Sequence, residues 1–218
     1  MTSALLTPKG RTLVWGGGSA LRLIQVQLEC IGRAADYIFQ DKLDVSPIHH
    51  LYPSIRSDLR EAAKECSHYI IAIGGGHGER RTQLSKLFRE IYNLQPLSVI
   101  HPTAYICPTA SINDPVLIFP GAVVHSFAHI GEDCILNTKS VVEHECLLGR
   151  GVHIMGSAVI TGRVKIDDFV TVGSNSTILP DLQLGHHSFI GAGAVVTKNV
   201  SPHQTVVGIP AKGLDKRT

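Results

Sequence analysis

Charged side chains are scarce in this sequence: Asp, Glu, Lys and Arg make up 17% of its 218 residues, with a formal net charge of +2. So small and balanced a charge argues against a protein that binds nucleic acid or an anionic membrane surface. No apolar run reaches the ~18 residues that span a bilayer. The stretch from Met1 to Gly10 is too short an apolar segment for a signal peptide. We therefore expect no membrane span and no nucleic-acid partner.

Disulfide signals are also missing. The five cysteines are an odd number and form no Cys-x-x-Cys pair, which argues against a disulfide framework and fits a reducing compartment. Aromatic residues amount to only 6%, whereas 21 residues are glycine. This balance favours tight, repetitive packing over a core of large rings. The sequence predicts a cytoplasmic protein.

A repeat of six residues fills the second half of the chain. Searching for internal repeats comes first, because a missed period misassigns the whole fold. One series is aliphatic throughout: Ile100, Ile106, Ile112, Ile118, Val124, Ile130, Leu136, Val142, Leu148, Ile154, Ile160, Ile166, Val172, Ile178, Leu184, Ile190 and Val196. A second series, four residues behind, is mostly small or β-branched: Ala104, Ala110, Val116, Ala122, Ala128, Cys134, Ser140, Cys146, Val152, Ala158, Val164, Val170, Ser176, Leu182, Ser188, Ala194 and Val200.

A period of six fits neither an α-helix nor plain strand alternation. It fits a prism with three flat sides, in which each side takes one hexad. The aliphatic residue then points inward, the small residue fits where the interior is narrow, and coils stack at the ~4.8 Å spacing of β-strands. The pattern predicts a parallel β-helix over residues 100–218.

Residues 1–99 follow a different pattern. Short apolar strands at Leu13–Trp15, Tyr37–Phe39 and Tyr69–Ile73 alternate with expected helices. The helices are expected at residues 19–31, 57–66 and 82–93. Strands that alternate with helices predict a small parallel sheet, and glycine-rich turns at the carboxyl ends of its strands are common phosphate sites. A tight strand-to-helix turn would also explain the glycines. The front of the chain is therefore expected to be a Rossmann-like α/β domain.

The β-helix pattern resembles the hexapeptide-repeat acyltransferases, and Val207–Lys212 resembles the closing segment of that family. The resemblance implies left-handed coils. A small α/β domain before such a β-helix resembles the group of sialic-acid O-acetyltransferases and bacillosamine-type nucleotide-sugar N-acetyltransferases. In that group the front domain holds the nucleotide end of the sugar substrate.

This resemblance implies a set of substrate-binding positions in the front domain. The group usually carries a histidine where this chain has Ala20, and an acidic pair where it has Gln40 and Asp41. Arg80 or Arg81 corresponds to the basic residue that follows the family's Ile-Gly turn. The expected substrate-binding residues are Gly16, Gly17, Gly18, Ser19, Ala20, Gln40, Asp41 and Gly74.

His144 is the expected catalytic base. It is third in its hexad, off the inward phase, so its ring should lie outside the core. Imidazole takes up a proton near neutral pH, as an attacking amine or hydroxyl requires, and Glu145 could orient the ring. Residues 137–146 closely resemble the active-site coil of the bacillosamine-type enzymes. Without that resemblance, an exposed histidine between acids on a solvated surface would be the simpler interpretation.

Further positions carry over from the same resemblance. Gly162 follows His144 by one coil and is expected to donate its backbone N–H to the thioester oxygen. His153, Gly162 and Ser174 are expected to contact acetyl-CoA, and Lys198 and Lys212 could meet its phosphates unless they are simply solvated. His153 lies half a coil round from His144, so the two belong to different faces. Sites shared between subunits of a homotrimer would unite them.

The remaining histidines and the cysteines carry weaker signals. His186 and His187 are adjacent and should point to different sides, and His203 lies outside any evident cluster. Cys134 and Cys146 fall on the small inward phase, so direct transfer is favoured over an acyl-cysteine intermediate.

The resulting hypothesis is an acetyl-CoA-dependent N-acetyltransferase. It would act on the amino group of a UDP- or dTDP-linked 4-amino-4,6-dideoxyhexose in bacterial glycan biosynthesis, with no metal. Three alternatives stay open. One is O-acetylation of a sialic-acid-type sugar, and another is a non-catalytic sugar-binding scaffold. The third is a zinc lyase of the γ-carbonic anhydrase type, which would need His125 and His129 to converge with His144 or His153.

Overall fold

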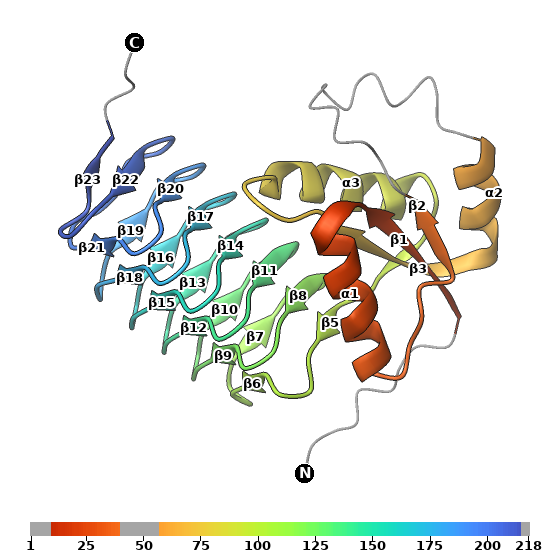
Figure 1. Cartoon of the computed structure of the whole chain (residues 1–218), viewed down its shortest axis with the longest axis horizontal. Helices are drawn as coiled ribbons and strands as arrows, with labels where there is room; N and C mark the ends of the chain where they lie inside the picture. Colours follow the sequence, from red (N-terminus) through yellow and green to blue (C-terminus); the bar gives the residue numbers. More distant parts are fainter. Residues whose placement is uncertain (1–9, 40–56, 215–218) are drawn as a thin grey trace.

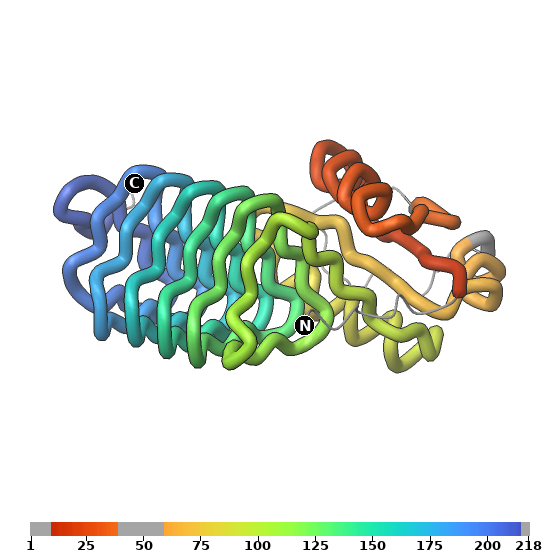
Figure 2. The backbone as a smooth tube through the Cα atoms, turned by 90° about the horizontal axis from the view of Figure 1, so that it is seen from below, coloured from red at the N-terminus to blue at the C-terminus, as the bar shows by residue number. Residues whose placement is uncertain are grey.

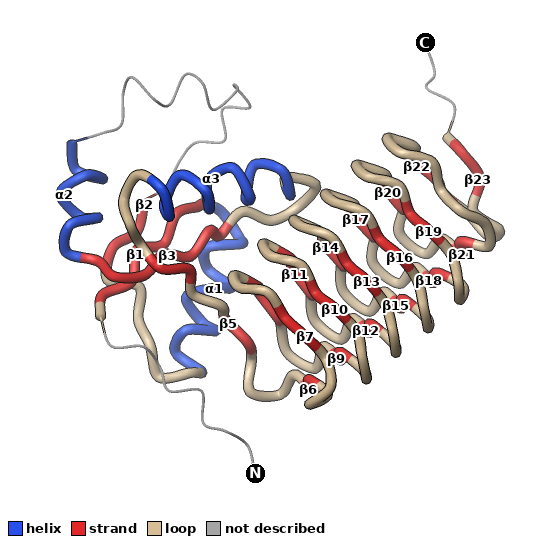
Figure 3. The backbone as a smooth tube through the Cα atoms, turned by 180° about the vertical axis from the view of Figure 1, so that it is seen from behind, coloured by secondary structure: helices blue, strands red, loops and turns tan. Residues whose placement is uncertain are grey.

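The computed structural model describes residues 10–39 and 57–214. A small α/β unit at one end of the molecule leads into a solenoid of stacked coils (Figure 1, Figure 2). Within the described ranges all helices lie in the front unit, and the solenoid consists of short strands and turns (Figure 3). None of these helices has the length and apolar character that a bilayer span requires.

The front unit is built on a parallel sheet of four strands in the order β2-β1-β3-β4. These are β1 (Arg11–Gly16), β2 (Tyr37–Phe39), β3 (Cys66–Ala72) and β4 (Gln95–Pro96). The pairs β1–β2, β1–β3 and β3–β4 are all parallel, so the connections cross over through helices. The predicted Rossmann-like α/β arrangement is confirmed.

Helices cover both faces of this sheet. They are α1 (Gly18–Cys30), α2 (Ser57–Glu65) and α3 (Gly78–Glu90). Leu13 and Trp15 point toward α2 and α3, whereas Val14 points toward α1, as strand alternation requires. Helix α3 begins at Gly78 rather than at the predicted Thr82, because the glycine turn before it is shorter than the sequence pattern indicated.

The solenoid has three flat sides. The first side has eight strands, the second six and the third five. The first side contains β5 (Val99–Ile100), β8 (Val116–Ile118), β11 (Cys134–Leu136), β14 (His153–Ile154), β17 (Thr171–Val172), β20 (Phe189–Ile190), β22 (Thr205–Val207) and the antiparallel β23 (Lys212–Gly213). The second side contains β6 (Tyr105–Ile106), β9 (Val123–Val124), β12 (Val141–Val142), β15 (Val159–Ile160), β18 (Thr177–Ile178) and β21 (Val195–Val196). The third side contains β7 (Ser111–Ile112), β10 (His129–Ile130), β13 (Leu147–Leu148), β16 (Lys165–Ile166) and β19 (Gln183–Leu184).

The two inward series that the hexad pattern predicted form the solenoid core. The aliphatic positions from Ile118 to Val196 are at most 2% exposed. Small residues such as Ala122, Ser140 and Ala158 are fully buried beside them. Partners eighteen residues apart pair in register, as Val141 does with Val159. The predicted β-helix is confirmed, with one hexad to each side.

The corners repeat as well. The fourth residue of the hexad has a positive φ at coil after coil, as at Glu145 (φ 58°), Arg163 (φ 59°) and Asp181 (φ 63°). This region costs a non-glycine residue about 1–2 kcal/mol. A hydrogen bond to the previous coil offsets part of that cost, as when the Glu145 N–H donates to the Ser126 carbonyl at 3.0 Å. These turns fix the direction in which each corner side chain leaves the solenoid.

The front unit packs on the first side of the solenoid. Helix α1 buries Leu21, Ile24 and Leu28 against a surface that includes Leu117 and Ile135. The Gln27 side chain donates to the Ile118 carbonyl at 3.2 Å. The first side is therefore the one that meets the glycine-rich turns of the front unit.

Candidate functional site

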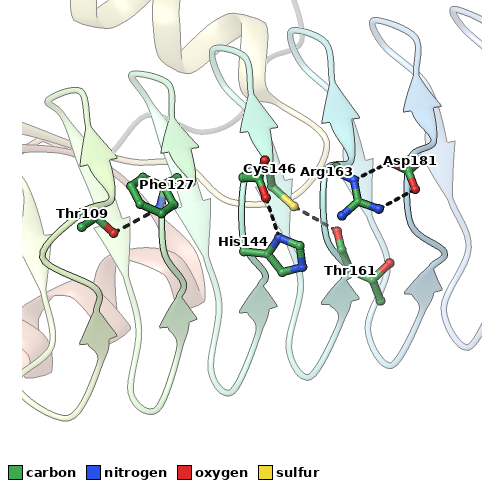
Figure 4. A network of polar contacts seen from close by, with 8 residues as sticks. Thr109, Phe127, His144, Cys146, Thr161, Arg163 and Asp181 are labelled. Atoms are coloured by element: carbon green, nitrogen blue, oxygen red, sulfur yellow. Dashed lines mark hydrogen bonds and ion pairs between the residues drawn. The ribbon is translucent and has the colours of Figure 1, made fainter.

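His144 lies on the corner between the second and third sides, where β12 turns into β13 (Figure 4). Its Nδ1 is 3.0 Å from Oε1 of Glu145. The two side chains are 42% and 54% exposed, so both are open to a ligand. Because a carboxylate can only accept, Nδ1 carries the proton, and Nε2 keeps a lone pair that can take up another. This is the geometry of an oriented imidazole base.

Gly162 lies one coil further along the same corner, directly under the His144 ring. A Cβ on Gly162 would come within 2.4 Å of Nε2 and 2.6 Å of Cε1 of His144. Only glycine therefore lets the ring rest against the backbone here. Within the described residues the Gly162 N–H donates to no acceptor. It is therefore free to donate a hydrogen bond to a ligand atom. The structure thus brings the predicted base and the predicted oxyanion donor together.

The corner residues on either side of this pair shape its surroundings. Arg163 donates to Asp181 through Nε at 2.6 Å and Nη2 at 2.8 Å, and this pair lowers the pKa of the Asp181 carboxyl. On the other side, Phe127 is 65% exposed and has a positive φ of 59°. An exposed aromatic ring in this backbone region is uncommon. His144 therefore lies between an apolar surface and an engaged ion pair (Figure 4).

His153 occupies a very different place. It lies on β14, on the outward surface of the first side, and is only 4% exposed because the front unit covers it. Its Nδ1 lies 3.0 Å from the Gly75 carbonyl oxygen. Burial, together with the nearby Arg81 cation, lowers the pKa of His153 to about 4. The ring is therefore neutral near pH 7, with its proton on Nδ1.

A cavity of about 160 Å³ lies between the front unit and the first side. Both glycine turns reach it, through Ser19 and Ala20 after β1 and through Gly74 and Gly75 after β3. Asn137 and His153 line it from the solenoid. Three of the expected substrate-binding residues, Ser19, Ala20 and Gly74, therefore share one cavity.

Among the described residues, the expected substrate-binding positions Gly16, Gly17 and Gly18 do not line this cavity. Gly16 backs onto β3, where a Cβ would come within 2.1 Å of the Ala72 carbonyl oxygen, so its role is close strand packing. Gly17 caps the start of α1, and Gly18 has a φ of 61° in open space. Gln40 and Asp41 lie outside the described residues.

Arg81 holds the cavity together from behind. It is 1% exposed and donates to the carbonyls of Ile73 at 3.2 Å, Asp133 at 3.0 Å and Gly151 at 2.9 Å. Burial lowers the pKa of Arg81 to about 10, so it stays charged near neutral pH. These three carbonyls belong to the glycine turn and to two coils of the solenoid. Arg81 thereby fixes the position of the turn over His153.

The expected acetyl-CoA contacts are spread around one chain. Gly162 shares the corner of His144, but His153 lies on the first side and Ser174 on the corner between the first and second sides. Lys198 and Lys212 are both exposed near the far end. The prediction that His144 and His153 belong to different faces is confirmed. A single chain does not unite the cofactor set.

Sequence reasoning missed a stack of imidazoles on the corner between the third and first sides. His187 and His203 stack with ring centroids 5.0 Å apart, and His186 meets His203 edge-on at 4.7 Å. The interpretation of His203 as isolated was therefore wrong. The turns that carry His187 and His203 are separated along the sequence but lie on adjacent coils. The His203 backbone N–H donates to the His186 carbonyl. Only knowing which residues pair between the last coils could have predicted this stack of histidine rings.

A groove of about 640 Å³ runs over the third side beside this stack, lined by Lys165, Asp167 and Asp168 among others. This groove is larger than the cavity at His153. Because neither His144 nor His153 lines the groove, it is not the candidate site despite its size. No three His, Cys, Asp or Glu side chains among residues 10–39 and 57–214 are placed to bind a metal ion.

The inward cysteines are core residues, as predicted. Cys134 and Cys146 are fully buried, and burial raises the pKa of their thiols to about 12 and about 11. A thiol so rarely ionised is a poor nucleophile. These two side chains therefore do not offer an acyl-carrying group.

The sequence and the fold match known proteins. Residues 163–198 match the bacterial transferase hexapeptide (six repeats) family. A perosamine N-acetyltransferase from Caulobacter crescentus, crystallised as a mutant with CoA and GDP-perosamine, superposes with a TM-score of 0.83 at 23% identity. That match covers 96% of this chain and 99% of the other. The acetyltransferase domain of PglB from Neisseria gonorrhoeae FA1090, in complex with acetyl coenzyme A, gives 0.75 at 24%, covering 94% and 100%. At these identities the likeness shows the fold.

A curated relative is the serine acetyltransferase of Buchnera aphidicola subsp. Schizaphis graminum, 25% identical over 171 residues. The match covers 75% of this chain and 64% of that protein, so the chain spans less than two thirds of that relative's length. Residues 163–198 thus resemble the hexapeptide-repeat family, and the superpositions show that the whole chain has the fold of such enzymes, a left-handed parallel β-helix that carries a small Rossmann-like α/β unit at its front.

Proposed function

We propose that the chain transfers the acetyl group of acetyl-CoA to the amino group of a nucleotide-linked amino-dideoxy sugar. The observation that carries this proposal is the pairing of His144 with Glu145 directly over the Gly162 backbone. The chain superposes on a perosamine N-acetyltransferase crystallised with CoA and on an acetyltransferase domain crystallised with acetyl-CoA, which supports the choice of donor.

The corner supplies the groups that acetyl transfer requires. The amine nitrogen attacks the thioester carbon while Nε2 of His144 removes its proton. The Glu145 carboxylate then stabilises the imidazolium through Nδ1. The Gly162 N–H donates to the oxygen that becomes negative in the tetrahedral intermediate. Collapse of that intermediate breaks the C–S bond, and the departing thiolate takes the proton from Nε2 to leave free CoA.

The cavity between the front unit and the solenoid is the proposed site for part of the nucleotide sugar. It contains Ser19, Ala20 and Gly74, three of the positions expected from sequence. The perosamine enzyme binds a GDP-linked sugar, whereas the sequence favoured UDP or dTDP, so all three nucleotides belong in the assay.

We also propose that the active unit is a homotrimer with sites between subunits. The outward positions of the second side form a mainly apolar column, with half-buried Val123, Val141 and Val159 followed by half-buried Thr177 and Val195. The described part of the chain puts nothing over them. A second subunit packed near this side would cover the column and could bring His153, Gly162 and Ser174 of different subunits toward one acetyl-CoA. Light scattering in solution tests this expectation.

The deciding experiment measures CoA release from acetyl-CoA with a panel of UDP-, dTDP- and GDP-linked amino sugars. Wild type, His144→Ala and His125→Ala are compared. His125 is an exposed histidine one coil back on the same corner, so its variant controls for surface changes. Turnover that falls about 10²–10⁴-fold only in His144→Ala supports the proposal.

Two results would contradict it. Turnover that survives in His144→Ala removes that residue from the role of base. Turnover on the matching hydroxyl sugars, with none on the amino sugars, replaces N-acetylation by O-acetylation. Binding of acetyl-CoA without turnover on any acceptor would indicate a scaffold.

A further inference from the structure

The third side of the solenoid carries a surface that the proposed acetyl transfer does not use. Its groove of about 640 Å³ lies over β10, β13 and β16 (Figure 1). A second groove, of about 240 Å³, continues it toward the last coils, and Asp167 lines both. Neither groove is lined by His144, Gly162 or His153. The two grooves form one strip of surface away from the candidate active site.

The strip is long because the outward residues of this side are in register. His129 pairs with Leu147, Leu147 with Lys165, and Lys165 with Gln183. Three intervals at the ~4.8 Å spacing of stacked strands give a length of about 14 Å. A strip of this length fits an extended ligand better than a single small ring.

Polar side chains along the strip lack partners within the protein. Among residues 10–39 and 57–214, the Asp167 carboxylate and the Gln183 side-chain amide make no hydrogen bond or ion pair. Asn199 accepts the Gln183 backbone N–H through Oδ1 at 2.9 Å, and its Nδ2 has no acceptor in those ranges. A carboxylate accepts hydrogen bonds, and an amide group both donates and accepts them. This set therefore matches a ligand that is rich in hydroxyl groups.

Aromatic rings line one edge of the first groove. Phe169 and His187 both line it, and their ring centroids are 5.0 Å apart. His203, stacked on His187 at 5.0 Å, extends the row of rings to the next coil. Leu147, which is 45% exposed, adds apolar surface within the groove. Rings and aliphatic side chains provide the apolar surface on which the C–H face of a sugar ring packs.

The charges along the strip do not favour an anion. Among the described residues, Lys165 is the only lysine or arginine that lines either groove, and the Asp167 carboxylate lines both. The other carboxylate, that of Asp168, accepts from Arg150 Nε at 3.0 Å and Nη2 at 2.7 Å. The strip is thus close to neutral, whereas a polyphosphate or nucleic acid requires a cluster of cations.

A peptide is disfavoured for a different reason. An extended peptide commonly binds by adding a strand to a free sheet edge. The strands β10, β13 and β16 each pair with a neighbour on both sides, so they offer no free edge. A peptide helix requires an apolar groove, whereas Lys165, Asp167 and Gln183 make this surface polar.

We infer that the third side binds a neutral, linear oligosaccharide. Its hydroxyls would hydrogen-bond to Asp167, Gln183 and Asn199, and its ring faces would pack against Phe169 and His187. The homotrimer proposed above packs near the second side, so the third side of each subunit would stay open to such a chain. The inference does not rest on the proposed acetyl transfer.

Isothermal titration calorimetry on the full chain tests this binding. The neutral probes are cellotetraose, maltotetraose and the N-acetylated chitin tetrasaccharide, with tetragalacturonate as an acidic chain and glucose as a single ring. At least one neutral tetrasaccharide should bind, about tenfold more tightly than glucose, because a longer chain makes more hydrogen bonds along the strip. Tetragalacturonate should bind more weakly than that tetrasaccharide.

Variants locate the bound sugar. Asp167→Ala removes a charged acceptor and Phe169→Leu removes an aromatic face, and each should weaken binding about tenfold. Glu90→Ala on α3 is the control, because it removes a carboxylate that is 62% exposed and lines neither groove. Glu90→Ala should bind like wild type. Thermal melts followed by circular dichroism show whether Phe169→Leu is folded, and Asp167→Ala decides the test if it is not.

Three results would overturn the inference. One is the absence of binding to every neutral tetrasaccharide. Another is binding that Asp167→Ala leaves unchanged, because the sugar would then lie elsewhere. The third is tighter binding of tetragalacturonate that is lost in Lys165→Ala, which would indicate an anion site. These titrations require no acetyl-CoA, and Asp167→Ala should keep the acetyl-transfer activity of wild type, so failure of the proposed function is a separate outcome.

Discussion

The corner around His144 and the cavity around His153 place the same side chain in opposite environments. His144 is 42% exposed and is paired with a carboxylate, whereas His153 is 4% exposed and is paired with a carbonyl beside a buried arginine. A carboxylate partner stabilises the imidazolium, but a neighbouring cation opposes it. Position within the repeat therefore separates a histidine suited to proton transfer from one suited to fixed recognition.

Replacing Arg81, the buried cation behind the cavity, should have the largest effect of the changes that test this comparison. Arg81→Met leaves three buried carbonyls without a donor, and we expect the free energy of unfolding of the front unit to fall by about 3 kcal/mol. Trp15, the only tryptophan, is buried in that unit and reports its unfolding by fluorescence in urea. Lys86→Met on the same helix, whose side chain is 69% exposed, is the control. A transition identical to wild type would show that Arg81 does not hold the cavity.

Adding one methyl group to the corner is the next test. Gly162→Ala would place a Cβ within 2.4 Å of Nε2 of His144, so the ring must move. We expect kcat to fall about 100-fold, because a shift of about 1 Å in a catalytic group has that effect. The melting temperature should change little, since the ring is exposed enough to move. If kcat were unchanged, His144 would not act from the position seen here.

The two environments also differ in how pH affects them. The pKa of His153 is about 4 in the folded protein and ~6.5 when unfolded, so below pH 6.5 the unfolded chain takes up the proton first. The stabilising contribution is complete above about pH 6.5 and is lost as the pH falls toward 4. Between pH 7.5 and 5, wild type should lose about 2 kcal/mol more stability than His153→Leu. Urea titrations at the two pH values measure this difference, and equal losses would place His153 in a more hydrated site.

The smallest expected effect concerns the carboxylate at the exposed corner. Glu145→Gln keeps the shape of the side chain but removes its charge. Because the pair is half exposed and screened by water, we expect kcat to fall only about fivefold. Steady-state kinetics at low and high salt measure the effect, which should shrink as salt rises. A loss above 100-fold would mean that the corner is desolvated when substrate binds.

The sequence predicted the β-helix almost completely because a hexad repeat has only one way to bury its aliphatic series. It also predicted that His144 lies outside the core and that Cys134 lies within it. The repeat could not indicate that the Gly75 carbonyl meets His153, because that contact joins residues 78 positions apart. It missed the burial of Arg81 for the same reason. The roles of the site residues stay predictions until the kinetic tests are done.

The positive-φ turns at the corners give the solenoid side-chain positions that repeat from one coil to the next. Each corner presents its side chains in fixed directions at intervals of one coil, so the neighbours of His144 are set by counting along the chain rather than by local loops. Deleting the eighteen residues 145–162 would keep every inward phase, yet it would place Pro180 under the His144 ring in place of Gly162. Conversely, a His and a Gly introduced one coil apart elsewhere on this corner would reproduce the same stacking. In such a protein an active site can be relocated by whole coils without redesigning the core.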